Sequence, residues 1–287
     1  DKLSFSLEVK KELSKLNTLA DKKNVKTELL GYMATNNVSV QKNKIKFSTE
    51  SEYNINRFGK LLNNLGLNDH NIKIQRSVYS ITINKNYIEE LTENNNDNKS
   101  DDLEKAFIRG AFLGSGTINN PEKKYHLEIS LRNLESAKYI LEILKKYNID
   151  FKILEKAKGY SIYTKDGEEI SKFLALIGAN SSVLKFEEIR VYRDIKNNIN
   201  RKVNCETANL NKIVNSSVKQ INDIKYLREK EKFNELPEQL RKIAEIREEN
   251  PDASLEELGK LLKNPIGKSG VNHRLRKIQQ IAEELRK

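Results

Sequence analysis

The stretch Ile108–Gly116 (IRGAFLGSG) is small and apolar, and it belongs to a run with helical spacing. A similar run, Leu29–Asn37 (LLGYMATNN), lies 79 residues earlier, so Gly110 in the second run corresponds to Gly31 in the first. Self-similarity at a fixed offset is the signature of an internal repeat. We therefore searched the neighbouring sequence for further matches at about the same offset.

Two more matches occur in the same order. The amphipathic segment 58–65 (FGKLLNNL) corresponds to 137–147 (AKYILEILKKY), at a shift near 82, and 79–81 (YSI) recurs as 160–162, at a shift of 81. Alternating polar and apolar residues predict strands at 44–47, 81–83, 125–129 and 161–163. Each repeat is predicted to contain a helix, two strands, a helix, two strands and a helix.

These matches predict an α+β tandem pseudo-dimer, with repeats at about 1–92 and 103–185. The polar segment 92–102 (TENNNDNKSDD) cannot form a core and is predicted to be a linker. Beyond it we expect a strand at 189–192, a long helix at 204–227 and a solvated hinge at 228–234 (REKEKFN). The predicted domains are therefore 1–190, a linker segment with a long helix at 191–232, and 233–287.

The last segment contains the start signals of three short helices. Pro237 opens the first, and Ser254 with Glu257 forms a capping box for the second. Ser269 is the expected N-cap of the third helix, whose apolar face is predicted to contain Val271, Leu275, Ile278, Ala282 and Leu285. This is the helix-turn-helix plan, although the connection 263–268 is longer than usual for that motif.

Charge is segregated within this segment. Residues 233–263 hold 5 basic and 8 acidic residues, whereas 264–287 hold 6 basic and 2 acidic ones. The third helix is predicted to turn polar and basic side chains outward, where they can reach phosphates and base edges. The alternative is an ordinary solvated helix face. The helix-turn-helix is placed at about Ser254–Lys287, and its candidate DNA-binding residues are Ser254, Lys268, Ser269, Gly270, Asn272, His273, Arg274, Arg276, Lys277 and Gln280.

The composition agrees with a nucleic-acid partner. The 287-residue chain carries a net charge of +11, which favours nucleic acid first and an acidic membrane surface second. No stretch approaches the roughly 18 apolar residues of a membrane-spanning helix. The single cysteine, Cys205, forms no intrachain disulfide, as expected in a reducing cytoplasm, and the three histidines lie too far apart for a zinc motif. The chain begins at Asp1 without a methionine, which leaves a removed targeting segment open.

Three stretches resemble those of a known family. The segments 203–212 (VNCETANLNK) and 268–276 (KSGVNHRLR) resemble the signature stretches of the WhiA family, and 109–113 with 121–128 resembles its central motif. The resemblance extends over essentially the whole chain. It implies a LAGLIDADG-type domain, built like a homing endonuclease, followed by a helix-turn-helix similar to sigma-factor region 4. It also implies transcriptional control, with roles in cell division, chromosome segregation and, in sporulating relatives, sporulation.

The resemblance also identifies the positions at which a nuclease would carry its catalytic acids. In LAGLIDADG enzymes two helices cross at small residues, and an acid at the end of each helix holds the catalytic metal. The corresponding positions here are Asn36 and Ser115, and no Asp or Glu lies in 29–49 or 105–121 to replace them. Neutral side chains cannot offset the charge of Mg²⁺. We therefore expect no catalytic residue, no metal site and a purely structural role for Gly31 and Gly110.

Such a domain also has a saddle, the sheet face that binds DNA, and this face can be kept without the catalytic acids. Six basic residues alternate with apolar ones along predicted strands and would share the face opposite the core: Lys44, Lys46, Lys73, Arg76, Lys156 and Lys158. Such a face attracts phosphates without reading sequence. A lysine-rich soluble surface is an equally good explanation, since lysine is abundant throughout the chain.

The prediction from sequence is a non-enzymatic, DNA-binding transcriptional regulator, cytoplasmic and nucleoid-associated, that binds double-stranded promoter DNA. No cofactor, membrane or small-molecule substrate is expected. The resemblance suggests that some relatives act with a WhiB-type iron–sulfur regulator; this regulator and RNA polymerase are the candidate protein partners. The alternative function is an interaction scaffold in cell division that is anchored to the nucleoid without direct promoter control. An active endonuclease is disfavoured by Asn36 and Ser115.

Overall fold

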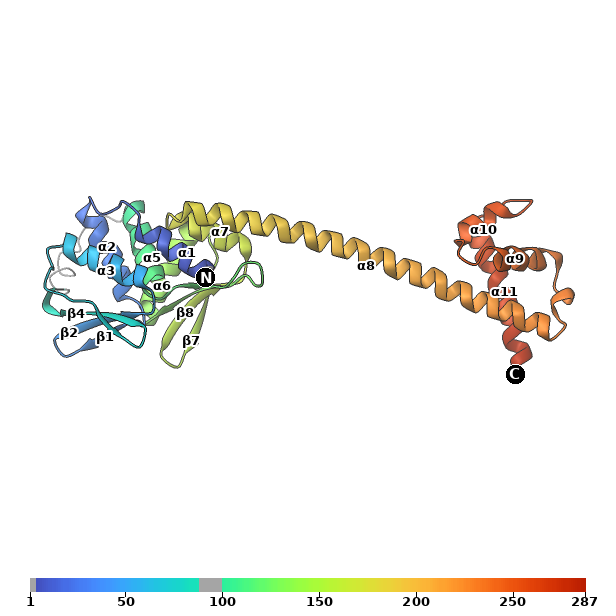
Figure 1. The fold of residues 1–287 in the computed structure, drawn as a ribbon, viewed down its shortest axis with the longest axis horizontal. Helices are drawn as coiled ribbons and strands as arrows, with labels where there is room; N and C mark the ends of the chain where they lie inside the picture. Colours follow the sequence, from blue (N-terminus) through green and yellow to red (C-terminus); the bar gives the residue numbers. More distant parts are fainter. Residues whose placement is uncertain (1–3, 88–99) are drawn as a thin grey trace. The chain divides into compact units, whose positions relative to one another are not determined.

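Two helices that cross at small residues form the centre of the N-terminal unit, as the ribbon of the computed structural model shows (Figure 1). They are α2 (Lys22–Met33) and α5 (Asp101–Ser115). A Cβ atom on Gly31 would overlap the carbonyl oxygen of Phe107, and one on Gly110 would overlap that of Glu28. Only glycine allows the two backbones to approach this closely. The structure describes residues 4–87 and 100–287, which divide into compact units at Asp194 and Ile195.

The two repeats surround these helices. The first contains α1 (Phe5–Ser14), α2, β1 (Val38–Gln41), β2 (Lys44–Thr49), α3 (Glu52–Asn64), β3 (Lys73–Gln75) and β4 (Val78–Asn84). The second contains α5, β5 (Thr117–Ile118), β6 (Leu127–Leu131), α6 (Leu134–Lys146), β7 (Lys152–Lys156), β8 (Gly159–Thr164) and α7 (Gly167–Leu176). The second repeat confirms the predicted order of elements. The third helix predicted for the first repeat falls outside the described residues.

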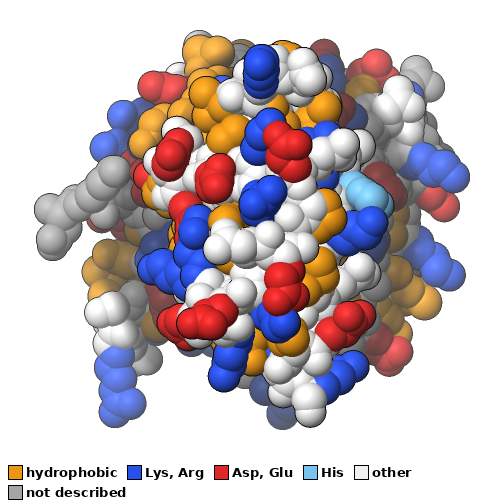
Figure 2. Space-filling model, turned by 90° about the vertical axis from the view of Figure 1, so that its right-hand side faces the viewer, with side chains coloured by type: hydrophobic (Ala, Val, Ile, Leu, Met, Phe, Trp, Pro, Cys, Tyr) orange, Lys and Arg blue, Asp and Glu red, His pale blue; other side chains and the backbone are white. Residues whose placement is uncertain are grey.

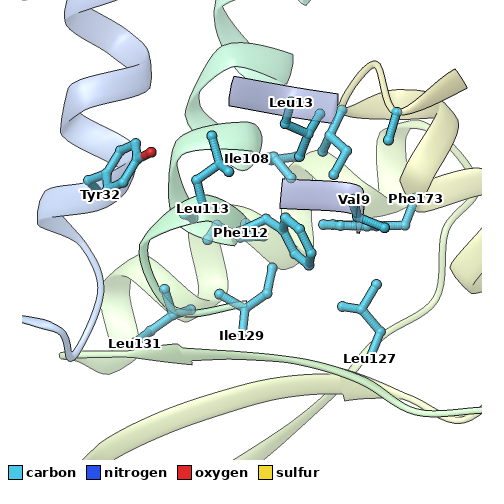
Figure 3. Packing of buried hydrophobic residues seen from close by; sticks show 14 of the residues in the cluster. Val9, Leu13, Tyr32, Ile108, Phe112, Leu113, Leu127, Ile129, Leu131 and Phe173 are labelled. Atoms are coloured by element: carbon cyan, nitrogen blue, oxygen red, sulfur yellow. The ribbon is translucent and has the colours of Figure 1, made fainter. Parts of the chain in front are cut away.

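Each repeat contributes one antiparallel sheet. The strand orders are β1-β2-β4-β3 and β5-β6-β8-β7, so the two sheets have equivalent topology. The helices pack on one face of the sheets and leave the other face open (Figure 1). Figure 3 shows Phe112 of α5 and Phe173 of α7 above the inward side chains of β6, beside Val9 of α1. The alternation of strand residues thus separates the core from the open face.

One buried carboxylate links the repeats. Glu28 of α2 accepts hydrogen bonds from Arg57 Nε of α3 at 2.8 Å and from Arg109 Nη1 of α5 at 3.3 Å. Glu28 and Arg57 are each 1% exposed. Since neither group meets water, each needs the other to compensate its lost hydration.

The C-terminal unit is a helical cluster built on the end of a long helix. The long helix is α8 (Asn180–Glu229), and it is followed by η1 (Phe233–Glu235), α9 (Glu238–Glu249), α10 (Leu255–Leu261) and α11 (Lys268–Arg286). Ile224 and Leu227 of α8 share a buried core with Val271, Leu275 and Ile278 of α11. None of the helices that the structure describes is long and apolar enough to cross a membrane.

Four expectations about boundaries need correction. The predicted strand 189–192 lies inside α8, and the end of the predicted linker, Asp101–Asp102, is the first turn of α5; the rest of that linker, up to residue 99, lies outside the described residues. The predicted hinge 228–234 is packed, because Arg228 stacks 3.6 Å from the Phe233 ring centroid and pairs with Glu248. A domain boundary at 233 would therefore cut through a core that includes Ile224. The N-cap of α11 is Gly267, not Ser269.

The predicted span of the helix-turn-helix, about Ser254–Lys287, runs from the N-cap of α10 to the C-cap of α11. Helix α11 ends at Arg286, and Lys287 is its exposed C-cap, outside the helix. A helix of 19 residues, rising about 1.5 Å per residue, places Lys287 roughly 28 Å along the axis from Lys268. Lys287 therefore marks the end of the span and lies far from the candidate DNA-binding residues at the start of α11.

Candidate nucleic-acid interface

The open face of the first sheet carries unpaired lysines. In β2, Ile45 and Phe47 are buried while Lys44 and Lys46 are exposed. Lys73 of β3 is paired with Ser80 of β4, and the open-face residues of β4 follow at every second position, so Lys73 lies on the face of Lys44 and Lys46. The predicted alternation is confirmed for Lys44 and Lys46, whereas all three residues of β3 are exposed and Lys73 is placed on this face by its pairing alone.

This face is hollowed rather than flat. A hollow of about 590 Å³ is lined by Lys44, Lys46, Lys73 and His70, together with Asn and Gln side chains. Among the described residues of the chain, Asp69 is the only acidic one in this lining. No ion pair with a described residue occupies any of the three lysines, so their charge remains available to an anion.

The open face of the second sheet is different because it contains its own counter-ion. Glu128 of β6 pairs with Lys156, accepts a 2.8 Å hydrogen bond from Ser161 Oγ and lies 3.2 Å from His126 Nε2. Burial raises the pKa of the Glu128 carboxyl, but the hydrogen bonds from these three groups outweigh burial and lower it to about 2. Lys156 thus lies on the predicted face, but its charge is already neutralised.

The other two saddle residues do not lie on strands. Arg76 occupies the turn between β3 and β4 with a positive φ of 47°, and Lys158 occupies the equivalent turn between β7 and β8. The prediction that they alternate along strands is therefore wrong. Both residues instead mark the tips of hairpins, where a side chain reaches farther from the sheet than one within a strand.

The two positions that hold catalytic acids in LAGLIDADG enzymes have structural partners. Asn36 Nδ2 donates a 2.8 Å hydrogen bond to the Lys158 carbonyl, and the Asn36 backbone N–H donates to the Ser130 carbonyl. Ser115 Oγ donates to the Ser130 carbonyl at 2.6 Å and accepts from its N–H at 3.1 Å. In the described part of the chain, no three His, Cys, Asp or Glu side chains gather as a metal site would require.

The third helix of the C-terminal unit turns its predicted polar face to solvent. Val271, Leu275, Ile278 and Ala282 are buried, and Leu285 is 40% exposed. Lys268, Ser269, His273, Arg276, Lys277 and Gln280 are exposed, while Gly270, Asn272 and Arg274 are half-buried. Ser254 closes the predicted capping box with Glu257 and so has a structural role at the start of α10.

The first turn of α11 is open to an anion. Its N-cap, Gly267, provides no side chain to bond the first backbone N–H groups, and the first turn contains no acidic residue. Lys268, Arg276 and Lys277 make no ion pair with a described residue, whereas Lys242, Lys260 and Arg286 are each paired with a carboxylate. In Figure 2, basic side chains are interspersed with acidic and apolar ones on the face turned to the viewer. The charge of these three α11 residues is therefore free, as is that of exposed Lys225 and Lys263, which make no ion pair with a described residue either.

Sequence reasoning missed three features of these surfaces. His70 comes from the loop after α3 and joins the lysines only through the tertiary fold. Glu128 and Lys156 are 28 residues apart and meet only because β8 lies between β6 and β7. Helix α1 was not predicted, although Phe5, Val9 and Leu13 recur at intervals of four residues and would have revealed it.

Comparison with known proteins decides the family. The protein-family model of the WhiA LAGLIDADG-like domain matches residues 104–196. The family model of the WhiA C-terminal helix-turn-helix (HTH) domain matches residues 199–282. A probable cell division protein WhiA of Clostridium tetani is 40% identical over 99% of both chains. The chain belongs to the WhiA family. The match to its Clostridium acetobutylicum relative, at 51% identity, spans 66% of this chain and 60% of that protein.

Solved WhiA structures have the same architecture. Full-length DUF199/WhiA from Thermotoga maritima superposes with a TM-score of 0.63 at 30% identity, over 98% of this chain and 99% of that one. The N-terminal LAGLIDADG domain of DUF199/WhiA superposes with a TM-score of 0.56 at 29% identity, over 62% of this chain and 92% of that one. The chain thus combines a LAGLIDADG fold with a C-terminal helix-turn-helix, as expected from sequence. The WhiA HTH model begins inside α8, in agreement with the C-terminal core that includes Ile224.

Proposed function

We propose that this WhiA-family protein is a non-enzymatic, sequence-specific DNA-binding regulator of transcription that acts in cell division and chromosome segregation, and in sporulation where the cell sporulates. It would act in the cytoplasm, at the nucleoid, on promoter DNA. RNA polymerase and a WhiB-type iron–sulfur regulator are the protein partners that we would test first.

The proposal rests on the arrangement of donor groups at the start of α11. The uncapped N–H groups behind Gly267 and the free ammonium of Lys268 suit a backbone phosphate. Exposed Arg276 lies two turns further along the helix and can donate two hydrogen bonds to a guanine edge in the major groove. Together they provide one positioning contact and one reading contact on the same helix.

The first sheet would add affinity without sequence preference. Lys44, Lys46 and Lys73 share a hollowed face with one acidic residue in its lining, whereas the second sheet neutralises Lys156 with Glu128. We therefore assign phosphate contacts to the first sheet and to the hairpin tips at Arg76 and Lys158. Of the six saddle residues expected from sequence, this assignment leaves out Lys156.

A scaffold is the second candidate, and one observation favours it. Ile195, Ile199, Val203 and Leu210 of α8 are each more than half exposed, which is unusual for a soluble helix. Such residues suit a protein partner better than DNA. In this reading the helix-turn-helix would serve only to anchor the protein to the nucleoid.

Genome-wide mapping of the protein on chromatin, with transcript levels measured in the same cells, separates the two functions. A regulator predicts binding at promoters, with matched changes in expression when Arg276→Ala replaces the wild type. A scaffold predicts binding without such changes, together with division defects that Arg276→Ala does not reproduce.

A further inference from the structure

A second pocket of the N-terminal unit, of about 630 Å³, has no part in the proposed DNA surfaces. It lies among the first turns of α1, the turn from β2 to α3 and the end of α5. It shares no lining residue with the hollow on the first sheet. Its lining consists mainly of hydroxyl and amide side chains, with one basic residue, Lys10, and one acidic residue, Glu50.

Lys10 places a cation without a direct ion pair in this pocket. It lies on the same face of α1 as Ser6, and helical side chains point towards the N-terminal end of their helix, which here borders the pocket. Lys10 forms no ion pair with a described residue. Burial lowers the pKa of its ammonium to about 8, against the weaker opposing effect of Glu50. The Glu50 carboxylate in the same lining acts on this ammonium electrostatically but forms no direct ion pair with it.

The hydroxyl groups of this lining have a hydrogen left to donate. Four of them already accept a backbone N–H: Ser4 from Leu7, Ser6 from Ile118, Thr49 from Ser51, and Ser51 from Asn54. A hydroxyl that accepts in this way keeps its own hydrogen to donate. Ser4 and Ser51 are also the N-caps of α1 and α3, so the positive ends of two helix dipoles border the pocket.

Asn54 adds no acceptor that a ligand can reach. It lines the pocket, is 1% exposed, and donates through Nδ2 to the Leu113 carbonyl at 2.6 Å, while its Oδ1 has no hydrogen-bond partner. A buried amide oxygen without a donor is costly. With less than 1 Å² of accessible area, this oxygen is closed to a ligand in the present conformation, so the acceptor open to a ligand in this lining is the Glu50 carboxylate.

We propose that this pocket binds a small metabolite that carries a carboxylate or phosphate together with a hydroxyl or amino group. Lys10 supplies the counter-charge, the hydroxyls of Ser6, Thr49 and Ser51 donate to the anionic oxygens, and the Glu50 carboxylate accepts from the hydroxyl or amino group of the ligand. The site does not depend on the proposed DNA function, because none of its residues belongs to the DNA surfaces.

The test uses the full chain and three probes: inorganic phosphate, citrate and ribose 5-phosphate. Calorimetry should detect binding of at least one probe, and Lys10→Met should weaken it at least tenfold, while Lys10→Arg retains it. Lys60→Met, which removes an exposed lysine of α3 outside the pocket, is the matched control and should bind like the wild type. In ¹³C NMR of the dimethylated lysines, the bound probe should move the pKa of Lys10 from about 8 towards its ordinary value of 10.5.

Two results would overturn the proposal. One is that no probe binds, or that Lys10→Met and Lys60→Met bind every probe as the wild type does. The other is that duplex DNA, and none of the three probes, moves the pKa of Lys10. The second result would make Lys10 a DNA contact instead of a metabolite ligand.

Discussion

The side-chain amide of Asn36 donates a hydrogen bond of 2.8 Å to the backbone carbonyl of Lys158, 122 residues further along the chain. The bond joins the end of the first crossing helix to a hairpin turn of the second repeat. Ser115, at the equivalent position of the second helix, holds the backbone of Ser130 in the same manner. Both positions that carry acids in the nuclease thus hold backbone of the second repeat.

The first prediction concerns this bond. Asn36→Asp removes the donor and turns a carboxylate towards the Lys158 carbonyl, so we expect a loss of about 1 kcal/mol in the free energy of unfolding, measured by urea denaturation. Asn198→Asp, at an exposed position of α8, is the control for added charge and should leave the midpoint unchanged. Neither Asn36→Asp nor the wild type should cut plasmid DNA with Mg²⁺ or Mn²⁺. Cleavage that is abolished by EDTA would contradict this account.

The second prediction concerns the buried ion group. Glu28→Gln leaves Arg57 and Arg109 without their shared carboxylate, and removing one partner of a buried pair costs about 3–5 kcal/mol. The thermal unfolding midpoint should fall sharply. Glu168→Gln removes an exposed partner of Lys172 and should leave the midpoint nearly unchanged. Equal effects of the two substitutions would show that Glu28 is not the link between the repeats.

The third prediction concerns the pH dependence of Glu128. Its folded pKa, about 2, lies below the ordinary 4.5, so its ion pair stabilises the fold above about pH 4.5 and loses that effect as the pH falls towards 2. Glu128→Gln should therefore cost roughly 2 kcal/mol at pH 7 and progressively less below pH 4.5. Urea denaturation across this range measures the difference. A cost that does not change with pH would indicate lost packing instead of lost charge.

The fourth prediction compares the two sheets. Lys46 is unpaired on the open face, and Lys156 is paired with Glu128 on its counterpart. Lys46→Gln should reduce the slope of log affinity against log salt concentration by about one, because one phosphate contact is lost. Lys156→Gln should leave it unchanged. Equal slopes for the two variants and the wild type would remove the first sheet from the DNA surface.

Local signals predicted much of the fold. The repeat of 29–37 at 108–116 indicated two related helical runs, and the resemblance to LAGLIDADG proteins implied that they cross at Gly31 and Gly110. The capping box at Ser254 was visible because it demands specific residue types at specific places. Period-two alternation likewise placed Lys44 and Lys46 on the open face.

Other features depend on tertiary contacts and had no local signal. Ile189–Tyr192 has strand propensity, yet it lies in α8, where Phe186 packs into the N-terminal core. The charge run at 228–234 resembled a hinge because the stacking of Arg228 on Phe233 is not visible from composition. The neutralised Lys156 required knowledge of which strands are neighbours.

The central claim is that α11 reads DNA sequence, and binding of the full chain to a selected site and to a scrambled duplex, across a salt series, tests it most directly. Arg276→Ala should lower the difference in binding free energy between the selected and the scrambled duplex by roughly 1–3 kcal/mol. It should also relax the sequence preference at one or two base positions. Lys268→Ala should weaken both duplexes alike and reduce the salt slope by about one. Both variants should fold, since neither residue lies on the buried face of Val271, Leu275 and Ile278. An unchanged affinity ratio for Arg276→Ala would contradict the account and move sequence recognition away from α11.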